Sequence, residues 1–289
     1  YLVRVARPVD DAGCVADIDR AGFAVEPHAA PVPHFESEDI GRGTDLKDHG
    51  AGARAVDRTA RNQVVVVPAG REAVHETLGI GRRAPATEYV YHLASLVRKG
   101  DVCIDIGANL GYYARLMSRI AGRNGHVYAV EPVAPIRRVL ERNLSGCGNV
   151  DILPYALGAA EGEIRMGNAT VRTGGYFGTG QNFVNDGGTS AAAEFPARMR
   201  RGSELFAGLR RLDFIKCDIE GYEVVVMNEL RPLLERFRPT VLIETGGENR
   251  PQIVALFTAL GYAGFTLDRG REIPLAPDTT KDIIFRHAH

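Results

Sequence analysis

The sequence is poor in cysteine, lacks long apolar runs and carries no excess of charge, and each absence excludes a class of protein. The 289 residues include 4 cysteines, none in CxxC spacing, which excludes a disulfide scaffold and favours a reducing, cytoplasmic location. The longest strongly apolar run, residues 64–67, is only as long as a strand, so we expect no membrane span and no membrane partner. With 35 basic and 36 acidic residues, the net charge of −1 provides no general attraction to nucleic acid or anionic lipid.

The composition itself, 45% hydrophobic and 25% charged, is typical of a folded globular protein. Residues 1–80 mix short apolar runs with turn formers and show no sustained periodicity, although residues 2–5 and 64–67 have the character of strands. We interpret residues 1–80 as an N-terminal extension or cap that binds substrate or a partner. Because the chain begins at Tyr1 and not at methionine, the sequence leaves open a leader ahead of it.

From residue 87 onward, strand-like apolar runs alternate with segments of helical periodicity. We predict helices at residues 89–97, 112–120, 224–230 and 251–260, and one more whose apolar face holds Ile136, Val139, Leu140 and Leu144. We predict strands at residues 101–106, 126–130, 150–153, 212–217 and 240–244, then an antiparallel pair at 263–267 and 282–285. This alternation predicts an α/β domain over residues 81–289, with a doubly wound, mostly parallel sheet covered by helices on both faces.

An insertion at about residues 160–211 separates the third predicted strand from the fourth. Its centre, residues 174–190, is rich in glycine and also holds Gln181, Asn182, Asn185 and Asp186. Two interpretations stay open: an unstructured hairpin tip, or a mobile loop that closes over a hydroxylated ligand.

The first predicted strand ends in the motif DIGANLG, residues 105–111, directly before a helix. Glycines let the backbone turn sharply and let a ligand lie against the main chain, and the helix N-terminus offers free amides. A nicotinamide dinucleotide site would have GxGxxG here, whereas this chain has GxNxG preceded by Asp105. A carboxylate at that place repels a pyrophosphate and suits a cationic amino-acid group. The motif therefore disfavours a nicotinamide-dependent dehydrogenase.

Further side chains at strand ends fit a nucleoside. Glu131 ends the second strand, where a carboxylate can accept both hydroxyls of a ribose. Tyr155, Ala156 and Leu157 follow the third strand, and they either line an adenine pocket or pack in the core.

The fourth strand ends in KCDIEG, residues 216–221, and the fifth ends at Glu244. Because side chains alternate along a strand, Lys216, Asp218 and Glu220 face one side as long as the extended conformation lasts. Carboxylates crowded at the switch point of a doubly wound sheet raise one another's proton affinity, which suits a general base. The structural alternative is an ion pair of Lys216 with an acid and a helix N-cap formed by Asp218. Three acids at one rim favour a functional role.

Together these segments resemble the FkbM-type family of S-adenosylmethionine (SAM)-dependent methyltransferases. The resemblance rests on residues 104–113, 127–132, 149–158, 213–223 and 242–244, and covers roughly residues 87–285. It implies a class I SAM-dependent methyltransferase fold with a seven-stranded sheet, and methyl transfer to a hydroxyl of a small secondary metabolite or sugar. The residues it implies are Asp105, Gly107, Asn109 and Gly111 for the methionine part of the cofactor, Glu131 for the ribose, Asp218 beside the reacting centre and Glu88 near the cofactor entrance.

Methyl transfer requires the protein to align the acceptor and remove its proton, because the sulfonium already carries an activated methyl group. Our candidates for the base are Asp218 and Glu220, with Glu244 as a supporting acid. Alternative bases are the histidines His28, His34, His49, His75 and His92. No His or Cys spacing supports a metal site, so we expect no metal.

Two other functions stay open. The first is a repurposed methyltransferase-fold enzyme that catalyses a non-methylating displacement in natural-product biosynthesis, and the second is a non-catalytic partner subunit. The intact Asp105 and Glu131 count against the first, and the acidic rim counts against the second. The partner we expect is a small hydroxylated substrate. The N-terminal region could equally form the interface of a homo-oligomer.

Overall fold

A computed structural model of the chain describes residues 2–4, 85–172, 176–185, 187, 190–280 and 282–288. All of these described residues belong to one compact unit. The predicted N-terminal extension, residues 1–80, lies outside the described residues except for the strand β1 (Leu2–Arg4). The strand expected at residues 64–67 is likewise outside them.

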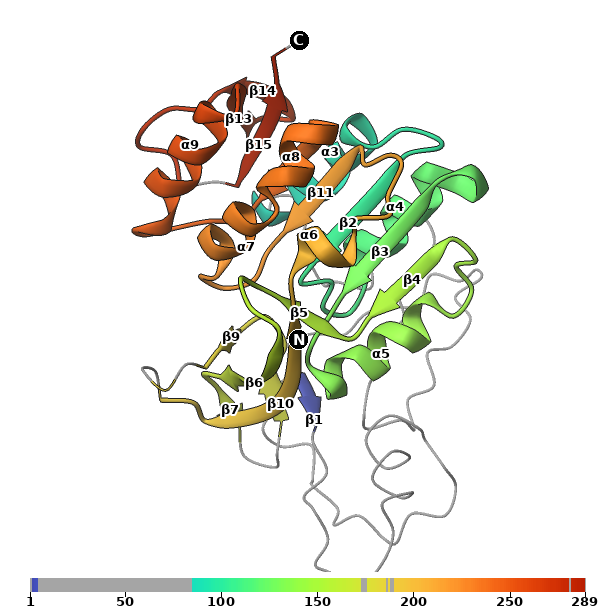
Figure 1. The fold of residues 1–289 in the computed structure, drawn as a ribbon, viewed down its shortest axis with the longest axis vertical. Coiled ribbons are helices and arrows are strands. Elements are labelled where there is room, and N and C mark those ends of the chain that lie inside the picture. The colour runs from blue at the N-terminus through green and yellow to red at the C-terminus, as the bar shows by residue number, and fades with distance from the viewer. Residues whose placement is uncertain are drawn as a thin grey trace, which may run out of the picture. The chain divides into compact units, whose positions relative to one another are not determined.

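Eight strands form the main sheet, in the order β14-β13-β15-β12-β11-β2-β3-β4 (Figure 1). They are β2 (Val102–Ile106), β3 (His126–Val130), β4 (Val150–Leu153), β11 (Phe214–Cys217), β12 (Thr240–Ile243), β13 (Tyr262–Asp268), β14 (Arg271–Pro274) and β15 (Ile283–His287). The pairs from β4 to β12 are parallel, whereas β15, β13 and β14 pair antiparallel. This confirms the doubly wound, mostly parallel sheet.

The sheet has one strand more than the predicted seven. β14 pairs antiparallel with β13 through a tight turn in which Asp268 lies opposite Arg271. Both residues of the turn, Arg269 and Gly270, have positive φ (48° and 77°), as two-residue hairpin turns require. An Arg-Gly pair is a weaker hairpin signal than Asn-Gly, and the sequence analysis missed it.

Helices cover both faces of the sheet (Figure 1). On one face lie α3 (Pro85–Leu96), α4 (Tyr112–Ala121) and α5 (Ala134–Leu144), and on the other lie α7 (Glu223–Glu229), α8 (Arg231–Phe237) and α9 (Asn249–Ala259). Each face of the sheet has its own hydrophobic core, and side chains of β2 contribute to both because they alternate in direction. Ile104 and Ile106 pack beneath α7–α9, whereas Cys103 packs beneath α3–α5. The predicted bounds agree with these elements within two residues, except that α3 begins earlier than residue 89.

The insertion builds a second, four-stranded sheet in the order β5-β10-β6-β9. Its strands are β5 (Tyr155–Leu157), β6 (Gly162–Asn168), β9 (Asn182–Val184) and β10 (Ala193–Arg200), and a short helix, α6 (Gly202–Leu205), follows. A third sheet joins β1 to β8 (Tyr176–Gly178) and β7 (Val171–Arg172). Interpreting the insertion's centre as an unstructured tip is therefore wrong for the strands β8 and β9. In Figure 1 the four-stranded sheet lies beside the carboxyl ends of β2 and β3.

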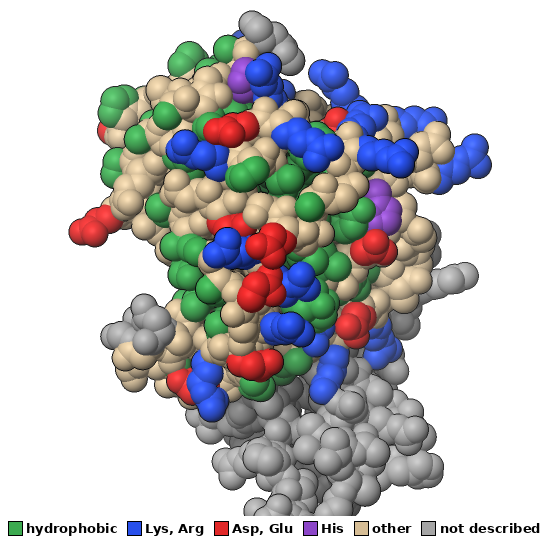
Figure 2. Space-filling view, in the orientation of Figure 1, with side chains coloured by type: hydrophobic (Ala, Val, Ile, Leu, Met, Phe, Trp, Pro, Cys, Tyr) green, Lys and Arg blue, Asp and Glu red, His purple; other side chains and the backbone are tan. Residues whose placement is uncertain are grey.

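Acidic and basic side chains are interspersed on the face drawn in Figure 2, in line with the balanced composition. Within the described part of the chain, no helix has the length and apolar character needed to cross a membrane.

Gly111 determines how closely the start of α4 packs against α5. Its φ is +91°, and a Cβ at this position would lie 2.7 Å from Cδ1 of Leu140. Gly111 is therefore required both for the backbone conformation and for the packing of the two helices.

Substituting Gly111 should test this packing role. We expect Gly111→Ala to lower the free energy of unfolding by about 2–4 kcal/mol, from left-handed strain and overpacking together. The matched control is Gly100→Ala, because Gly100 has a similar φ of +87° but no atom within 4 Å of a Cβ. The control should lose only about 1–2 kcal/mol, from strain alone. Urea unfolding measures both, and equal losses would contradict the packing role.

Candidate functional site

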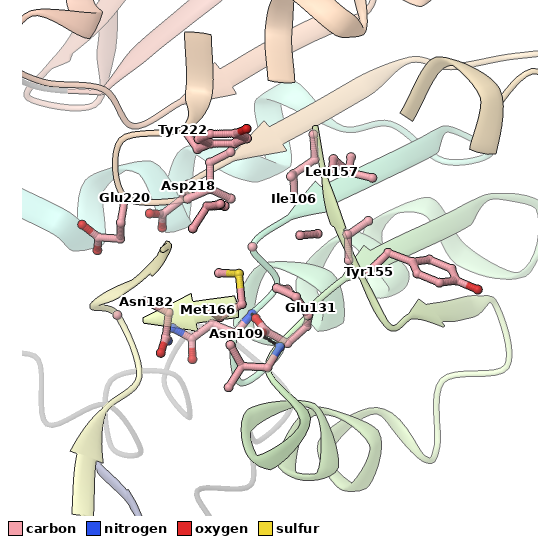
Figure 3. A pocket seen from close by; sticks show the side chains of 18 of the residues that line it. Ile106, Asn109, Glu131, Tyr155, Leu157, Met166, Asn182, Asp218, Glu220 and Tyr222 are labelled. Carbon is pink, nitrogen blue, oxygen red and sulfur yellow. Dashed lines mark hydrogen bonds between the residues drawn. The ribbon is translucent and has the colours of Figure 1, made fainter. Parts of the chain in front are cut away.

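The carboxyl ends of β2, β3, β11 and β12 open onto a cavity of about 500 Å³ (Figure 3). Doubly wound sheets bind ligands at this edge, and the volume lies in the usual range of about 300–1,000 Å³ for small-molecule sites. The main-sheet side contributes Ile106, Gly107, Asn109, Val130, Glu131, Pro132, Val133, Asp218, Ile219, Glu220, Tyr222 and Glu244. The insertion and the strand before it contribute Tyr155, Ala156, Leu157, Met166, Thr179, Gly180, Asn182 and Val184.

Gly107 allows the ends of β2 and β11 to meet at this cavity. Its φ is +79°, and a Cβ there would lie only 2.0 Å from the carbonyl oxygen of Asp218. The backbone N–H of Asp218 donates to the carbonyl of Ile106 at 3.1 Å, and that of Gly107 donates to the carbonyl of Val130 at 3.1 Å. Any side chain at residue 107 would force the two loops apart.

Glu131 is buried at the end of β3 and ties two loops together. Its Oε2 accepts from the backbone N–H of Asn109 at 3.0 Å, and its Oε1 accepts from that of Val133 at 2.9 Å. Burial raises the pKa of Glu131 to about 7, although both amides favour the charged form. Because each carboxylate oxygen has a second lone pair, Glu131 can still accept hydrogen bonds from a ligand in the cavity.

Asn109 connects the loop after β2 to the insertion. It has a positive φ of 51°, and its Nδ2 donates to the carbonyl of Thr179 at 3.1 Å. Its Oδ1 is buried without a hydrogen-bond partner. An unsatisfied buried acceptor is costly, so a ligand that donates to this oxygen would bind favourably here.

The predicted acids Asp218, Glu220 and Glu244 all line the cavity. Lys216 forms an ion pair with Asp218, with 2.8 Å between Nζ and Oδ2. Although Glu244 is partly exposed, its neighbours crowd it: partial burial, followed by the charges of Asp218 and Asp282, raises its pKa to about 7. Burial and the neighbouring Asp218 also raise the pKa of Glu220.

Two details of the predicted arrangement of this segment are wrong. The extended conformation stops at Cys217, and Glu220 has a φ of 53°, so the alternation of faces does not continue through it. Asp218 is not a helix N-cap, because α7 begins at Glu223 with Tyr222 at its N-cap position. The predicted ion pair of Lys216 with an acid is present.

Asp105 and Gly111, both predicted to contact a cofactor, do not line the cavity. Gly111 packs against α5, as described above. Asp105 is fully buried, and burial raises its pKa to about 6, although the charge of Lys216 and the backbone N–H of Ala114 oppose the rise. The side chain of Glu88 lies outside the described residues.

The alternative bases among the histidines gain no support. His92 bonds Glu272 at 2.7 Å and does not line the cavity, and the other four histidines proposed as bases lie outside the described residues. In the described ranges, no three His, Cys, Asp or Glu side chains are placed to hold a metal ion.

The insertion lines the cavity, in line with the alternative that it lies over a ligand, but it does so through ordered strands that were not predicted. Asn168 is fully buried and its Nδ2 donates to the carbonyl of Gly178 and to Oδ1 of Asn182. Asn182 in turn donates to the carbonyl of Thr179 at 2.7 Å, which fixes the turn that lines the cavity. Asparagines repeated through a glycine-rich segment were the available signal, because their side chains bond the backbone of turns.

A family model described as "Methyltransferase FkbM domain" matches residues 105–265, more than half of the chain. Methyltransferase sdnD of Sordaria araneosa is 26% identical over 217 residues, which cover 65% of this chain and 83% of that protein. Protein-L-isoaspartate O-methyltransferase of Methanosarcina mazei is 34% identical over 80 residues, 26% of this chain. The chain spans about a third (33%) of the length of that relative.

Among solved structures, the Methyltransferase FkbM of Methylobacillus flagellatus KT aligns with a TM-score of 0.43 at 12% identity. The alignment covers 77% of this chain and 56% of that one.

Proposed function

The chain belongs to the FkbM family of SAM-dependent methyltransferases, and we propose that its cavity binds SAM and directs methyl transfer to a hydroxyl of a small secondary metabolite or sugar. The observation that carries the proposal is the meeting of three features in one cavity: the glycine-bent loop after β2, the buried carboxylate at the end of β3, and the acids after β11 and β12.

The residues present fit the cofactor. Glu131 is already oriented by two backbone amides, and its remaining lone pairs suit two ribose hydroxyls. The unpartnered Oδ1 of Asn109 suits the protonated amine of the methionine part. Tyr155 and Ala156, on the insertion side of the cavity, suit an adenine ring.

When bound, SAM supplies an electrophilic methyl group on a sulfonium. The chain has to hold the acceptor oxygen in line with the methyl carbon and the sulfur, exclude water, and accept the proton of the acceptor hydroxyl. We assign the proton to Glu244, because a pKa of about 7 suits a general base at neutral pH. One oxygen of Asp218 is engaged by Lys216, so Asp218 serves better as a fixed negative charge. The sequence had suggested the opposite assignment, with Asp218 or Glu220 as the base and Glu244 as a supporting acid.

The cavity also favours one charge type of acceptor. None of the described residues that line it is basic, whereas Glu131, Asp218, Glu220 and Glu244 are acidic. A phosphorylated or carboxylated acceptor would meet repulsion without a compensating cation. We therefore propose a hydroxylated acceptor without phosphate or carboxylate groups.

We keep the cytoplasmic location as a proposal that rests on cysteine usage. The described cysteines Cys103, Cys147 and Cys217 are free thiols. A stable reduced state of such thiols is typical of a reducing compartment.

Replacing Glu131 tests the cofactor assignment. We expect Glu131→Ala to weaken binding of both SAM and its demethylated product, S-adenosylhomocysteine (SAH), by about 100-fold, because charge-assisted hydrogen bonds are lost. Glu141→Ala is the matched control, since Glu141 is exposed on the neighbouring helix α5. Isothermal titration calorimetry measures both, and unchanged affinity in Glu131→Ala would refute the ribose contact.

Replacing Glu244 tests the assignment of the base. With an acceptor found by screening extracts for uptake of labelled methyl groups, Glu244→Gln should lower kcat by about 10²–10⁴-fold. The wild-type rate should rise with pH, reach half its maximum near pH 7 and level off above it, as Glu244 loses its proton. Glu248→Gln, at an exposed position shortly after Glu244, is the control and should keep the wild-type rate. A pH-dependent, undiminished rate in Glu244→Gln would assign the base to another residue.

A further inference from the structure

Lys216 is a buried cation that has so far been described only as the ion-pair partner of Asp218. It lies in β11 with 6% of its surface exposed and does not line the cavity. In the parallel pairing of β11 with β2, Lys216 lies directly opposite Asp105. Its Nζ also lies 4.7 Å from the centre of the Tyr113 ring, on the α4 side of the sheet.

The ammonium of Lys216 lies among carboxylates on both sides. It contacts Oδ2 of Asp218 at 2.8 Å, and the fully buried Asp105 lies opposite it on the neighbouring strand. Burial opposes the charge of Lys216, but Asp218 and Asp105 outweigh it and raise its pKa. Glu220, Glu244 and Asp282 face the same ammonium at longer range, since its charge lowers the pKa of each.

This geometry links a fully buried acid to an acid at the cavity. An ion pair buried for stability alone is weak compared with apolar side chains of similar volume. Here one partner, Asp218, has a side chain that is 31% exposed and lines the cavity, so the pair holds a charge at a ligand site. Glu244 also lines the cavity, and its backbone N–H donates to the carbonyl of Cys217 at 3.0 Å, so the end of β12 is held beside the end of β11.

We propose that Lys216 is a positioning residue of the methyl-transfer site, whose buried ammonium holds the carboxylate of Asp218 in one orientation at the cavity. The inference rests on the proposed function, that SAM binds in this cavity. A fixed negative charge favours the cationic sulfonium of SAM over the neutral thioether of SAH. Lys216 therefore sets the ratio of the two affinities, and through it the release of product.

The test compares SAM with SAH by calorimetry at pH 8 in the wild type and three variants. The double variant Lys216→Met/Asp105→Asn removes one positive and one negative charge, so the net charge of the cluster is unchanged. It should reduce the preference for SAM over SAH by about tenfold, because the carboxylate of Asp218 loses its anchor. Lys216→Arg should retain most of the preference, because it restores a cation. Lys99→Met, at an exposed lysine, is the control and should match the wild type.

Asp105→Asn is part of the variant because loss of the buried cation alone would leave Asp105 uncompensated and destabilise the fold. If the double variant does not fold, Lys216→Leu/Asp105→Asn replaces it and should show the same reduced preference. A folded variant that keeps the wild-type ratio would overturn the proposal and leave Lys216 a structural residue. Failure of the proposed function looks different: the wild-type protein would then bind neither SAM nor SAH.

Discussion

The close approach of two strand ends determines the rest of the site. At Gly107 the backbone after β2 comes so near the carbonyl of Asp218, after β11, that a Cβ would lie at 2.0 Å. Because the ends of β2 and β11 meet there, the loop that carries Asn109 and the loop that carries Glu220 line the same cavity. The same pairing places Lys216 opposite Asp105, which puts a cation at the point where the acids converge. A glycine without any catalytic group thus brings the chemical groups together.

The converging acids carry a cost in stability. Burial raises the pKa of Glu131 from 4.5 to about 7, so the folded protein holds this proton more tightly than the unfolded chain does. The contribution of Glu131 is therefore complete below about pH 4.5 and is lost as the pH rises through about 7. A protein optimised for stability alone would replace such acids, so their presence is more readily explained by ligand binding and proton transfer.

Much of the main sheet could be predicted from the sequence, because apolar runs and helical periodicity report local structure directly. The bounds of β3 and β4 agree with the prediction, and Glu131 lies at a ligand cavity as its place at a strand end suggested. What failed depends on packing between distant segments. Periodicity does not reveal that Asp105 is buried away from the cavity, or that Gly111 allows α4 to pack against α5. Nor does it reveal that strands of the insertion line one side of the cavity. These outcomes follow from which elements meet in space, and no local pattern encodes that.

The central claim is that this cavity holds an adenosyl sulfonium or its thioether product. A crystal structure of the protein with SAH tests it most directly. The account predicts the ribose hydroxyls on Glu131, the adenine beside Tyr155 and Ala156, and the sulfur on the side of the cavity where Asp218 lies. An adenosine group bound elsewhere on the chain, or a cavity without SAH at saturating concentration, would contradict it.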